Sequence, residues 1–317
     1  LENCYSTGNV SGYYYVGGLI GEFSGKSLEN CYSTGNVSGY YYVGGLIGEF
    51  SGKSLENCYS TGNVSGYYYV GGLIGNLYNE GYSDSGGSSS YNISSCHSTA
   101  NVSGTYNVGG LIGYLGVYCY MSYSEIYINS CYAKTTITGN NQLGGLIGCI
   151  EGDGGVHITK CHTDCEITCN DSYAAGIVGY FSGYGYEFYI RYCYANVKIL
   201  ANYYAAGILA ASYLDSNNIE QCYSTGEIVC NNAAGVMSTD YSYGSYYVAD
   251  CFSTMFLPLT SDYNYGYDYN TNCCYRAQGY SPDLGWSSGP ETWENSGAWE
   301  TPIASFPKLL NVGGQED

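Results

Sequence analysis

The sequence has little charge, and positive charge is the scarcest kind. Of its 317 residues 11% are charged, and 8 Lys and Arg stand against 27 Asp and Glu, for a formal net charge of −19. Because binding to phosphates needs a basic surface, nucleic acid is not expected as a partner. Long apolar runs are also missing from the sequence, so we expect no membrane-spanning helix.

Motifs of catalysis are missing as well. The chain has no H-E-x-x-H, no phosphate-binding glycine loop and no recognisable Ser-His-Asp set. Ala and Leu, which favour helices, are scarce, whereas 47 Gly and 43 Tyr are present. The composition therefore argues against a helical fold and against an enzyme.

What the sequence does contain is a repeat. Residues 1–27 recur without change at 28–54, and 55–75 repeat the first part of the unit again. A fixed period predicts units that bury their apolar faces only by stacking on their neighbours. The period continues in degraded form, marked by a column of cysteines: Cys4, Cys31, Cys58, Cys96, Cys131, Cys161, Cys193, Cys222, Cys251 and Cys274.

Around each of these cysteines the sequence alternates with a period of two, which is typical of strands. In the first unit Cys4, Ser6 and Val10 fall on one face, and Tyr5 and Thr7 fall on the other. We predict an all-β fold: a parallel β-solenoid of about ten coils over 1–276, then a non-repetitive cap or assembly segment over 277–317. Each coil is expected to have three short strands, with bends at Gly-Gly pairs that permit positive φ angles.

The cysteine column is predicted to be a ladder of buried thiols. In-register neighbours lie about 4.8 Å apart, but side chains that point the same way fit the disulfide dihedral poorly. The cysteines off the column are better disulfide candidates: Cys119, Cys149, Cys165, Cys169, Cys230 and Cys273. Cys161, Cys165 and Cys169 spread along one strand face, too far apart for one tetrahedral metal site. No metal and no cofactor are expected.

An aromatic residue or histidine follows each column cysteine and is predicted to point outward. Rings at coil spacing can stack on one another, so this ladder either stabilises the sheet or forms a stripe that binds sugars or a partner. Its members are Tyr5, Tyr32, Tyr59, His97, Tyr132, His162, Tyr194, Tyr223, Phe252 and Tyr275.

Polar columns run beside the aromatic one on the same outer face. Four of their residues are predicted to form an amide ladder: Asn9, Asn36, Asn63 and Asn101. Further along, Glu166, Lys198 and Glu227 alternate in sign, and Lys134 stands opposite Asp164. These opposite charges are interpreted as fixing the register between neighbouring strands. The lysines also neutralise Asp164 and Glu166, the paired carboxylates that would otherwise suit catalysis.

Two further features concern the surface. Asn92 and Asn170 lie in N-x-S sequons outside the crowded repeat positions, so they are the candidate glycan acceptors. The units after the second carry insertions, rich in Tyr, Gly and Ser, between the GLIG-like motif and the next unit. All of these insertions are expected to leave the solenoid at one corner.

The unit N-C-Y-S-T-G-N-V-S-G…V-G-G-L-I-G resembles the GLUG motif, a repeat of secreted and cell-surface proteins, mostly bacterial. In some IgA-cleaving peptidases the motif lies outside the catalytic domain. The resemblance covers about residues 1–238 and implies an extracellular or cell-surface location and no enzymatic activity. The ending also resembles that of GLUG arrays, through Trp286, Trp293, Trp299 and the Phe306-Pro307-Lys308-Leu309 stretch.

These observations predict an extracellular structural or adhesive repeat protein that self-associates into a surface fibre or array. A carbohydrate-binding surface module is the alternative, and a polysaccharide-cleaving β-helix enzyme is the least favoured reading. Leu1 stands on a repeat boundary, so we expect the chain to be processed or part of something longer. The first coil is then expected to meet further repeats or another subunit.

Overall fold

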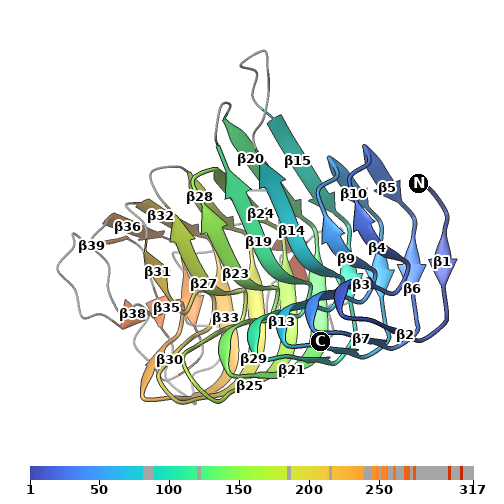
Figure 1. Cartoon of the computed structure of the whole chain (residues 1–317). Coiled ribbons are helices and arrows are strands. Elements are labelled where there is room, and N and C mark those ends of the chain that lie inside the picture. Colours follow the sequence, from blue (N-terminus) through green and yellow to red (C-terminus); the bar gives the residue numbers. More distant parts are fainter. Residues whose placement is uncertain are drawn as a thin grey trace.

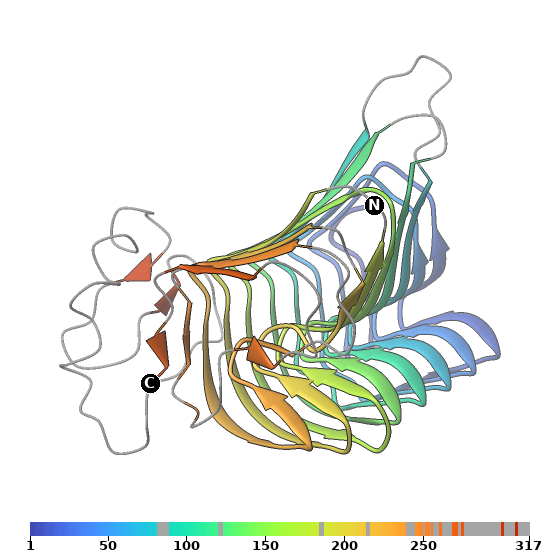
Figure 2. The ribbon, with the colours of Figure 1, turned by 90° about the vertical axis from the view of Figure 1, so that its left-hand side faces the viewer.

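The computed structural model is all-β, and its short parallel strands stack coil upon coil into a β-solenoid (Figures 1 and 2). Among the residues that the structure describes there is no helix. The described residues are 1–80, 89–119, 123–183, 187–213, 216–238, 245–249, 251–253, 255, 260–261, 268–271, 274–275, 299–300 and 308–309.

The first sheet contains the strands that follow the column cysteines. Its main path is β1 (Tyr5–Ser6), β6 (Tyr32–Ser33), β11 (Tyr59–Ser60), β16 (His97–Ser98), β21 (Tyr132–Gly139), β25 (His162–Cys169), β29 (Tyr194–Ala201), β33 (Tyr223–Val229), β37 (Phe252–Ser253) and β40 (Cys274–Tyr275). Beside them lie β2 (Val10–Ser11), β7 (Val37–Ser38), β12 (Val64–Ser65) and β17 (Val102–Ser103). In later coils one long strand therefore replaces two short ones.

The second sheet begins at the tyrosine triplets, and the third at the GLIG-like motif. The second is β3 (Tyr14–Gly17), β8 (Tyr41–Gly44), β13 (Tyr68–Gly71), β18 (Tyr106–Gly109), β22 (Asn141–Gly144), β26 (Tyr173–Ala175), β30 (Tyr204–Ala206) and β34 (Asn232–Ala234). The third is β4 (Ile20–Phe23), β9 (Ile47–Phe50), β14 (Ile74–Glu80), β19 (Ile112–Tyr118), β23 (Ile147–Gly152), β27 (Val178–Gly183) and β31 (Ser212–Tyr213).

The fourth sheet closes each coil ahead of the next cysteine. It is β5 (Ser27–Glu29), β10 (Ser54–Glu56), β15 (Ser89–Ser94), β20 (Ser124–Asn129), β24 (Gly155–Thr159), β28 (Phe188–Arg191), β32 (Ser216–Glu220), β36 (Ser245–Ala249) and β39 (Asp268–Thr271). Two small pairs stand apart: parallel β35 (Met237–Ser238) with β38 (Thr260–Ser261), and antiparallel β41 (Trp299–Glu300) with β42 (Lys308–Leu309).

Two details of the predicted solenoid need correction. A coil has four faces and not three strands, and the third sheet holds seven strands although the first holds ten along its main path. About seven turns are thus complete on every side in the described part of the chain, fewer than the ten coils predicted. The predicted segment 277–317 lies outside the described residues, apart from β41 and β42, as do Trp286 and Trp293.

Equivalent residues of successive units stack on one another, which is why the cysteine spacing revealed the architecture. Leu28 pairs with Leu55, and Val37 pairs with Val64. The tenth unit departs from this rule, because Cys274 pairs with Phe252. Cys274 therefore stands in register with the aromatic column, one residue away from its predicted place, and a one-residue slip exchanges the two faces of a strand. The preceding residue, Cys273, lies outside the described residues. Because it is also a cysteine, the sequence was compatible with either Cys273 or Cys274 as the member of the column.

The core fills the narrow interior between the sheets. In the second unit Leu28, Cys31, Val37, Val43 and Ile47 are at most 1% exposed. The outward partners of these positions, such as Thr34 and Asn36, are exposed. The predicted alternation of inward and outward faces is thus present along the first sheet.

The sharp corners do not depend on glycine, contrary to the prediction. Residues with positive φ include Asn30 (53°), directly before a column cysteine, and Tyr42 (55°), inside a tyrosine triplet. The Gly-Gly pair of the same unit, Gly44 and Gly45, is not among the described positive-φ residues. A Cβ on Gly44 would overlap the carbonyl oxygen of Ile47 and lie 2.6 Å from the Gly75 nitrogen. Close backbone packing, and not backbone conformation, therefore requires these glycines.

The insertions lengthen strands of the third and fourth sheets at their shared corner. β14 and β19 have seven residues where β9 has four, and β15 and β20 have six where β10 has three. Together β14, β15, β19 and β20 form a raised wing at the top of Figure 1. The described strands that flank the insertions belong to the third sheet before them and to the fourth sheet after them, as expected for insertions at one corner.

Candidate interaction surfaces

The column cysteines are part of the core. Cys4 is half-buried, and the other described members up to Cys251 are buried. Each thiol donates to the carbonyl two residues earlier, as from Cys31 to Glu29 (3.2 Å) and from Cys58 to Glu56 (3.2 Å). These carbonyls also accept a backbone N–H from the preceding coil, as Glu29 does from Asn3 at 3.0 Å, so the thiol is a second and weaker donor. Burial raises the pKa of Cys96 and Cys161 well above the usual range, which keeps these two thiols neutral. Against the effect of burial, hydrogen bonds from the neighbouring ladder thiols lower the pKa of Cys131 and Cys193, which alternate with them.

The described cysteines off the column are also free thiols and not disulfides. Cys149, Cys165 and Cys169 are buried, and Cys119 and Cys230 are half-buried. Cys165 donates to Ala133 and Cys169 donates to Asn140 in the preceding coil. Of the six disulfide candidates, Cys273 alone lies outside the described residues, and the prediction is wrong for the other five, which are free thiols.

The aromatic column forms one continuous stack of rings. From Tyr5 to Tyr223 each of the eight rings lies 4.6–5.2 Å from the next, with interplanar angles of 13° or less. The stack is exposed at Tyr5, half-buried as far as Tyr132, and buried from His162 onward. Its second half therefore presents no stripe to solvent. The side chains of Phe252 and Tyr275 lie outside the described residues.

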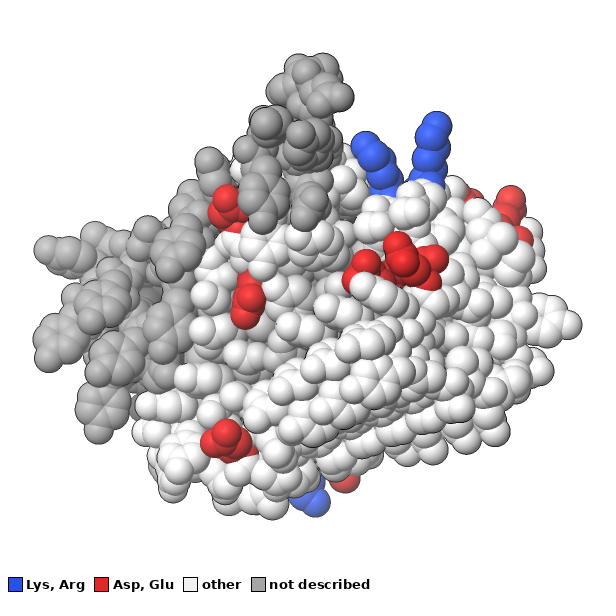
Figure 3. All heavy atoms as spheres, in the orientation of Figure 1, with Lys and Arg blue, Asp and Glu red and all other residues white. Residues whose placement is uncertain are grey.

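The second sheet carries three further ladders of tyrosines, side by side on its outer face. The triplet beginning at Tyr13 stacks on those beginning at Tyr40 and Tyr67, with ring centroids 4.9–5.2 Å apart. Tyr13 and Tyr14 are more than half exposed. Burial, with smaller contributions from neighbouring groups, raises the pKa of Tyr69 to about 12. Figure 3 shows that the face over β3, β8 and β13 is broad and almost free of charged side chains.

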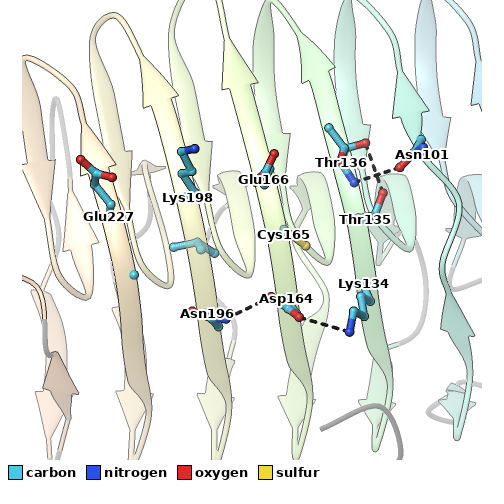
Figure 4. Close-up of a pocket in the computed structure, with 12 residues that line it drawn as sticks. Asn101, Lys134, Thr135, Thr136, Asp164, Cys165, Glu166, Asn196, Lys198 and Glu227 are labelled. Carbon is cyan, nitrogen blue, oxygen red and sulfur yellow. Dashed lines mark hydrogen bonds and ion pairs between the residues drawn. The ribbon is translucent and has the colours of Figure 1, made fainter. Parts of the chain in front are cut away.

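A shallow hollow of about 530 Å³ lies on the outer face of the first sheet, over β21, β25, β29 and β33 (Figure 4). Lys134 Nζ lies 3.7 Å from Asp164 Oδ2, and the Asn196 amide donates to Asp164 Oδ1 at 3.0 Å. In the next row Glu166, Lys198 and Glu227 stand in register. The hollow therefore has polar rows that follow the predicted alternation of sign, and Asp164 is already occupied by its neighbours.

The asparagine column differs in detail from the predicted amide ladder. The side-chain oxygens of Asn9 and Asn36 each accept the backbone N–H of the asparagine in the next coil, at 2.9 Å. A direct amide–amide bond joins Asn30 and Asn57 instead, at the corner before the cysteines (2.6 Å). In the N-terminal coils asparagine thus stabilises the coil-to-coil contact both at this column and at the corner before the cysteines, and the direct amide–amide contact is at the corner.

The two candidate glycan acceptors are both exposed. Asn92 lies inside β15, where its backbone N–H bonds to the Lys53 carbonyl, and not in a loop. Asn170 lies in the bend after β25, and its amide donates to Asn140.

A cluster that the sequence did not predict lies on the fourth sheet. Glu125 of β20, His157 of β24 and Glu187, which directly precedes β28, bring their ligand atoms within 4.8 Å of one another. The signal was present in the sequence, but these residues fall in segments that were counted as insertions. Counted back from Ile128 and Ile190, both glutamates occupy the same position of their units.

Identical repeats also stack like charges. Glu22 pairs in register with Glu49, whose Oε2 accepts a hydrogen bond from the Asn76 amide at 2.7 Å. Burial, and after it the charge of Glu22, raises the pKa of Glu49 against the lowering effect of this hydrogen bond. A raised pKa means that folded Glu49 holds its proton where the unfolded chain has lost it, so stability falls as pH rises from the unfolded pKa of about 4.3.

Glu49→Gln is therefore expected to raise the melting temperature at pH 7, because the amide keeps the Asn76 contact without the charge. Below pH 4 the gain should disappear, since the wild-type carboxyl is then protonated in both states. Thermal melts of both proteins at the two pH values test this. A gain that is equal at both pH values would show that charge is not its cause.

The fold and its ladders define a class: a repeat protein in which each unit is one coil of a parallel β-solenoid. Residues 12–38 and 39–65 each match the family model described as the GLUG motif. The chain thus carries GLUG repeats, as the resemblance predicted. No curated protein and no solved structure was found to match it. In the part of the chain that the structure describes, no helix could cross a membrane.

Proposed function

We propose that the chain is an extracellular structural or adhesive repeat protein whose coils self-associate laterally into a surface fibre or array. The tyrosine ladders of the second sheet carry the proposal. They form a wide apolar face with hydroxyl groups, exposed at Tyr13 and Tyr14, on a scaffold held by continuous parallel pairing. Large exposed aromatic patches of this kind mark interaction sites. The GLUG repeats support the location, because proteins that carry them are secreted or held at the cell surface.

The orientation of the rings favours a protein contact over a sugar contact. Within each ladder a ring such as Tyr41 is stacked on Tyr14 and on Tyr68, both at 5.1 Å. Both faces of the ring are therefore covered, and edges and hydroxyls remain for a partner. A sugar ring that stacks on an aromatic face would find such a face only at the outermost rings.

Sedimentation velocity and negative-stain imaging of the chain at micromolar concentration test self-association. We expect extended multimers for the wild type and monomers for the triple variant Tyr14→Ser, Tyr41→Ser and Tyr68→Ser. The matched control replaces Thr7, Thr34 and Thr61, an exposed row of the first sheet, with Ser and should assemble normally. A monomeric wild type, or a tyrosine variant that assembles like it, would contradict the proposal.

The second candidate function is a carbohydrate-binding module, favoured by the rows of tyrosine hydroxyls. Affinity electrophoresis in gels with and without polysaccharide separates the two functions. Retardation of the wild type but not of the tyrosine variant, with both proteins monomeric, would favour sugar binding.

We also propose that the chain is not an enzyme. Of the paired carboxylates Asp164 and Glu166, the first is bound by Lys134 and Asn196, and the second stands in register with Lys198. Neither is therefore poised as a general acid or base. Release of new reducing ends from any polysaccharide by the purified chain would contradict this.

A further inference from the structure

We propose that Glu125, His157 and Glu187 form a binding site for a divalent transition metal, with Zn²⁺ the ion that fits best, which braces three successive coils of the fourth sheet. The three residues come from β20, β24 and the residue before β28, and these strands are direct neighbours in the sheet. Their ligand atoms lie within 4.8 Å of one another. The sequence predicted no metal, because it pointed to cysteines as the only clustered ligands.

The histidine is held in place for such a role. Its ring lies between Tyr127 (4.6 Å) and Tyr189 (5.3 Å), nearly parallel to both. Its Nε2 atom is shielded from solvent and forms no hydrogen bond, and its 3.5 Å contact with Glu125 Oε1 is an ion pair only when the ring is protonated. A buried polar atom without a hydrogen bond is costly. An atom of this kind, aimed at a carboxylate, points to a ligand between them.

The surroundings of the carboxylates agree with this role. The Tyr127 hydroxyl donates to Glu125 Oε2 at 2.8 Å, Tyr123 also hydrogen-bonds to this carboxylate, and Oε1 lies on the histidine side. Partners of this kind orient metal-binding carboxylates. Gly155 stands in register with Glu125, and a Cβ there would lie 3.1 Å from Glu125 Cγ and 2.9 Å from the Tyr123 hydroxyl. The absence of a side chain at Gly155 thus leaves room for the Glu125 side chain and the Tyr123 hydroxyl, which lie against it.

The donor set selects the kind of metal. One imidazole nitrogen with two carboxylate oxygens suits Zn²⁺ and similar ions, whereas Ca²⁺ and Mg²⁺ take oxygen ligands. Around tetrahedral Zn²⁺ the donor atoms are about 3.4 Å apart, so His157 and Glu125 already have a fitting separation. Glu187 is exposed and has room to adjust. Three protein ligands leave a fourth position for water.

Binding would add a cross-link between strands that are already joined by the β-ladder and by the stacked rings of Tyr127, His157 and Tyr189. In a repeat stack, stability depends on the contacts between neighbouring units, and a ligand bound only by the folded state raises stability by mass action. The cation would also neutralise two carboxylates in a chain with a formal net charge of −19.

Isothermal titration of the metal-free chain with ZnCl₂, together with thermal melts, tests the site. We expect one Zn²⁺ per chain, a higher melting temperature with Zn²⁺, and no comparable shift with CaCl₂ or MgCl₂. Glu125→Gln, His157→Ala and Glu187→Gln should each weaken binding at least about tenfold. The control Glu166→Gln, a carboxylate of the first sheet, should bind as the wild type does. Circular dichroism of each variant checks that the solenoid is intact.

The many free thiols require a separate arm of the experiment, because they also bind Zn²⁺. Co²⁺ bound by cysteine shows intense thiolate-to-metal charge-transfer absorption, and Co²⁺ bound by one imidazole and two carboxylates does not. Saturation without this absorption, abolished by the three variants, supports the site. Thiolate absorption at the first equivalent, binding that the three variants leave unchanged, or no saturable binding at all would overturn it.

Discussion

Val37→Asp is expected to unfold the N-terminal coils at 25 °C, with a loss of more than about 4 kcal/mol. Val37 is 1% exposed and stacks in register between Val10 and Val64. A carboxylate there would lie among apolar side chains without a partner, and burial of an unpaired charge is among the most destabilising single changes. The effect should be local at first, because a repeat array unfolds unit by unit.

Thr34→Asp is the matched control, since it adds the same side chain to the same coil. Thr34 is exposed, so the change should stay within about 0.5 kcal/mol. Urea denaturation followed by far-UV circular dichroism gives both values. Limited proteolysis with mass spectrometry then shows which coils are lost from the Val37 variant. Equal destabilisation by the two variants would mean that the inward and outward faces are reversed.

The sequence predicted the solenoid because parallel in-register stacking places like upon like. Cys31, Val37 and Leu28 are inward and recur at the same positions of each unit. A residue type that fits the narrow core in one coil also fits it at the same position of every other coil. The columns can therefore be recognised from the sequence alone. The pairing of Lys134 with Asp164 followed from the same reasoning.

What the sequence could not predict depends on corners and on insertions. A period of two shows strands but not the angle between them, so the fourth face was missed. The left-handed corners fall on Asn30 and Tyr42, where the residue type gives only a weak signal. The Glu125, His157 and Glu187 cluster was missed because these residues fall in segments that were counted as insertions, although both glutamates stand six residues before their column cysteines. The spacing of the aromatic column in the sequence does not show that its rings are buried from His162 onward.

Repetition has opposite consequences for rings and for charges. Identical units stack Tyr13 on Tyr40 at 5.0 Å, which is favourable, but they also stack Glu22 on Glu49, which is not. Units whose sequences have diverged can place opposite charges in register. Arg191, for example, forms a 3.0 Å ion pair with Glu220 of the next coil.

Gly44→Ala is expected to cost more than about 3 kcal/mol, although alanine usually stabilises where glycine is not needed. The added Cβ would overlap the Ile47 carbonyl oxygen and approach the Gly75 nitrogen. Both are backbone atoms of the stacked coils, so neither can move away without breaking the β-ladder. Gly8 is the control, because a Cβ there meets nothing within 4 Å. Gly8→Ala should leave stability unchanged or raise it by up to about 1 kcal/mol.

A third variant separates the steric role of Gly44 from a conformational one. Asparagine tolerates positive φ better than other residues with a side chain. If the Gly-Gly pair served a left-handed corner, Gly44→Asn would be much milder than Gly44→Ala. Because the obstacle is space for any Cβ, the Asn variant should be at least as destabilising as the Ala variant in urea denaturation. An Asn variant close to wild-type stability would restore the conformational explanation and refute close packing as the reason for these glycines.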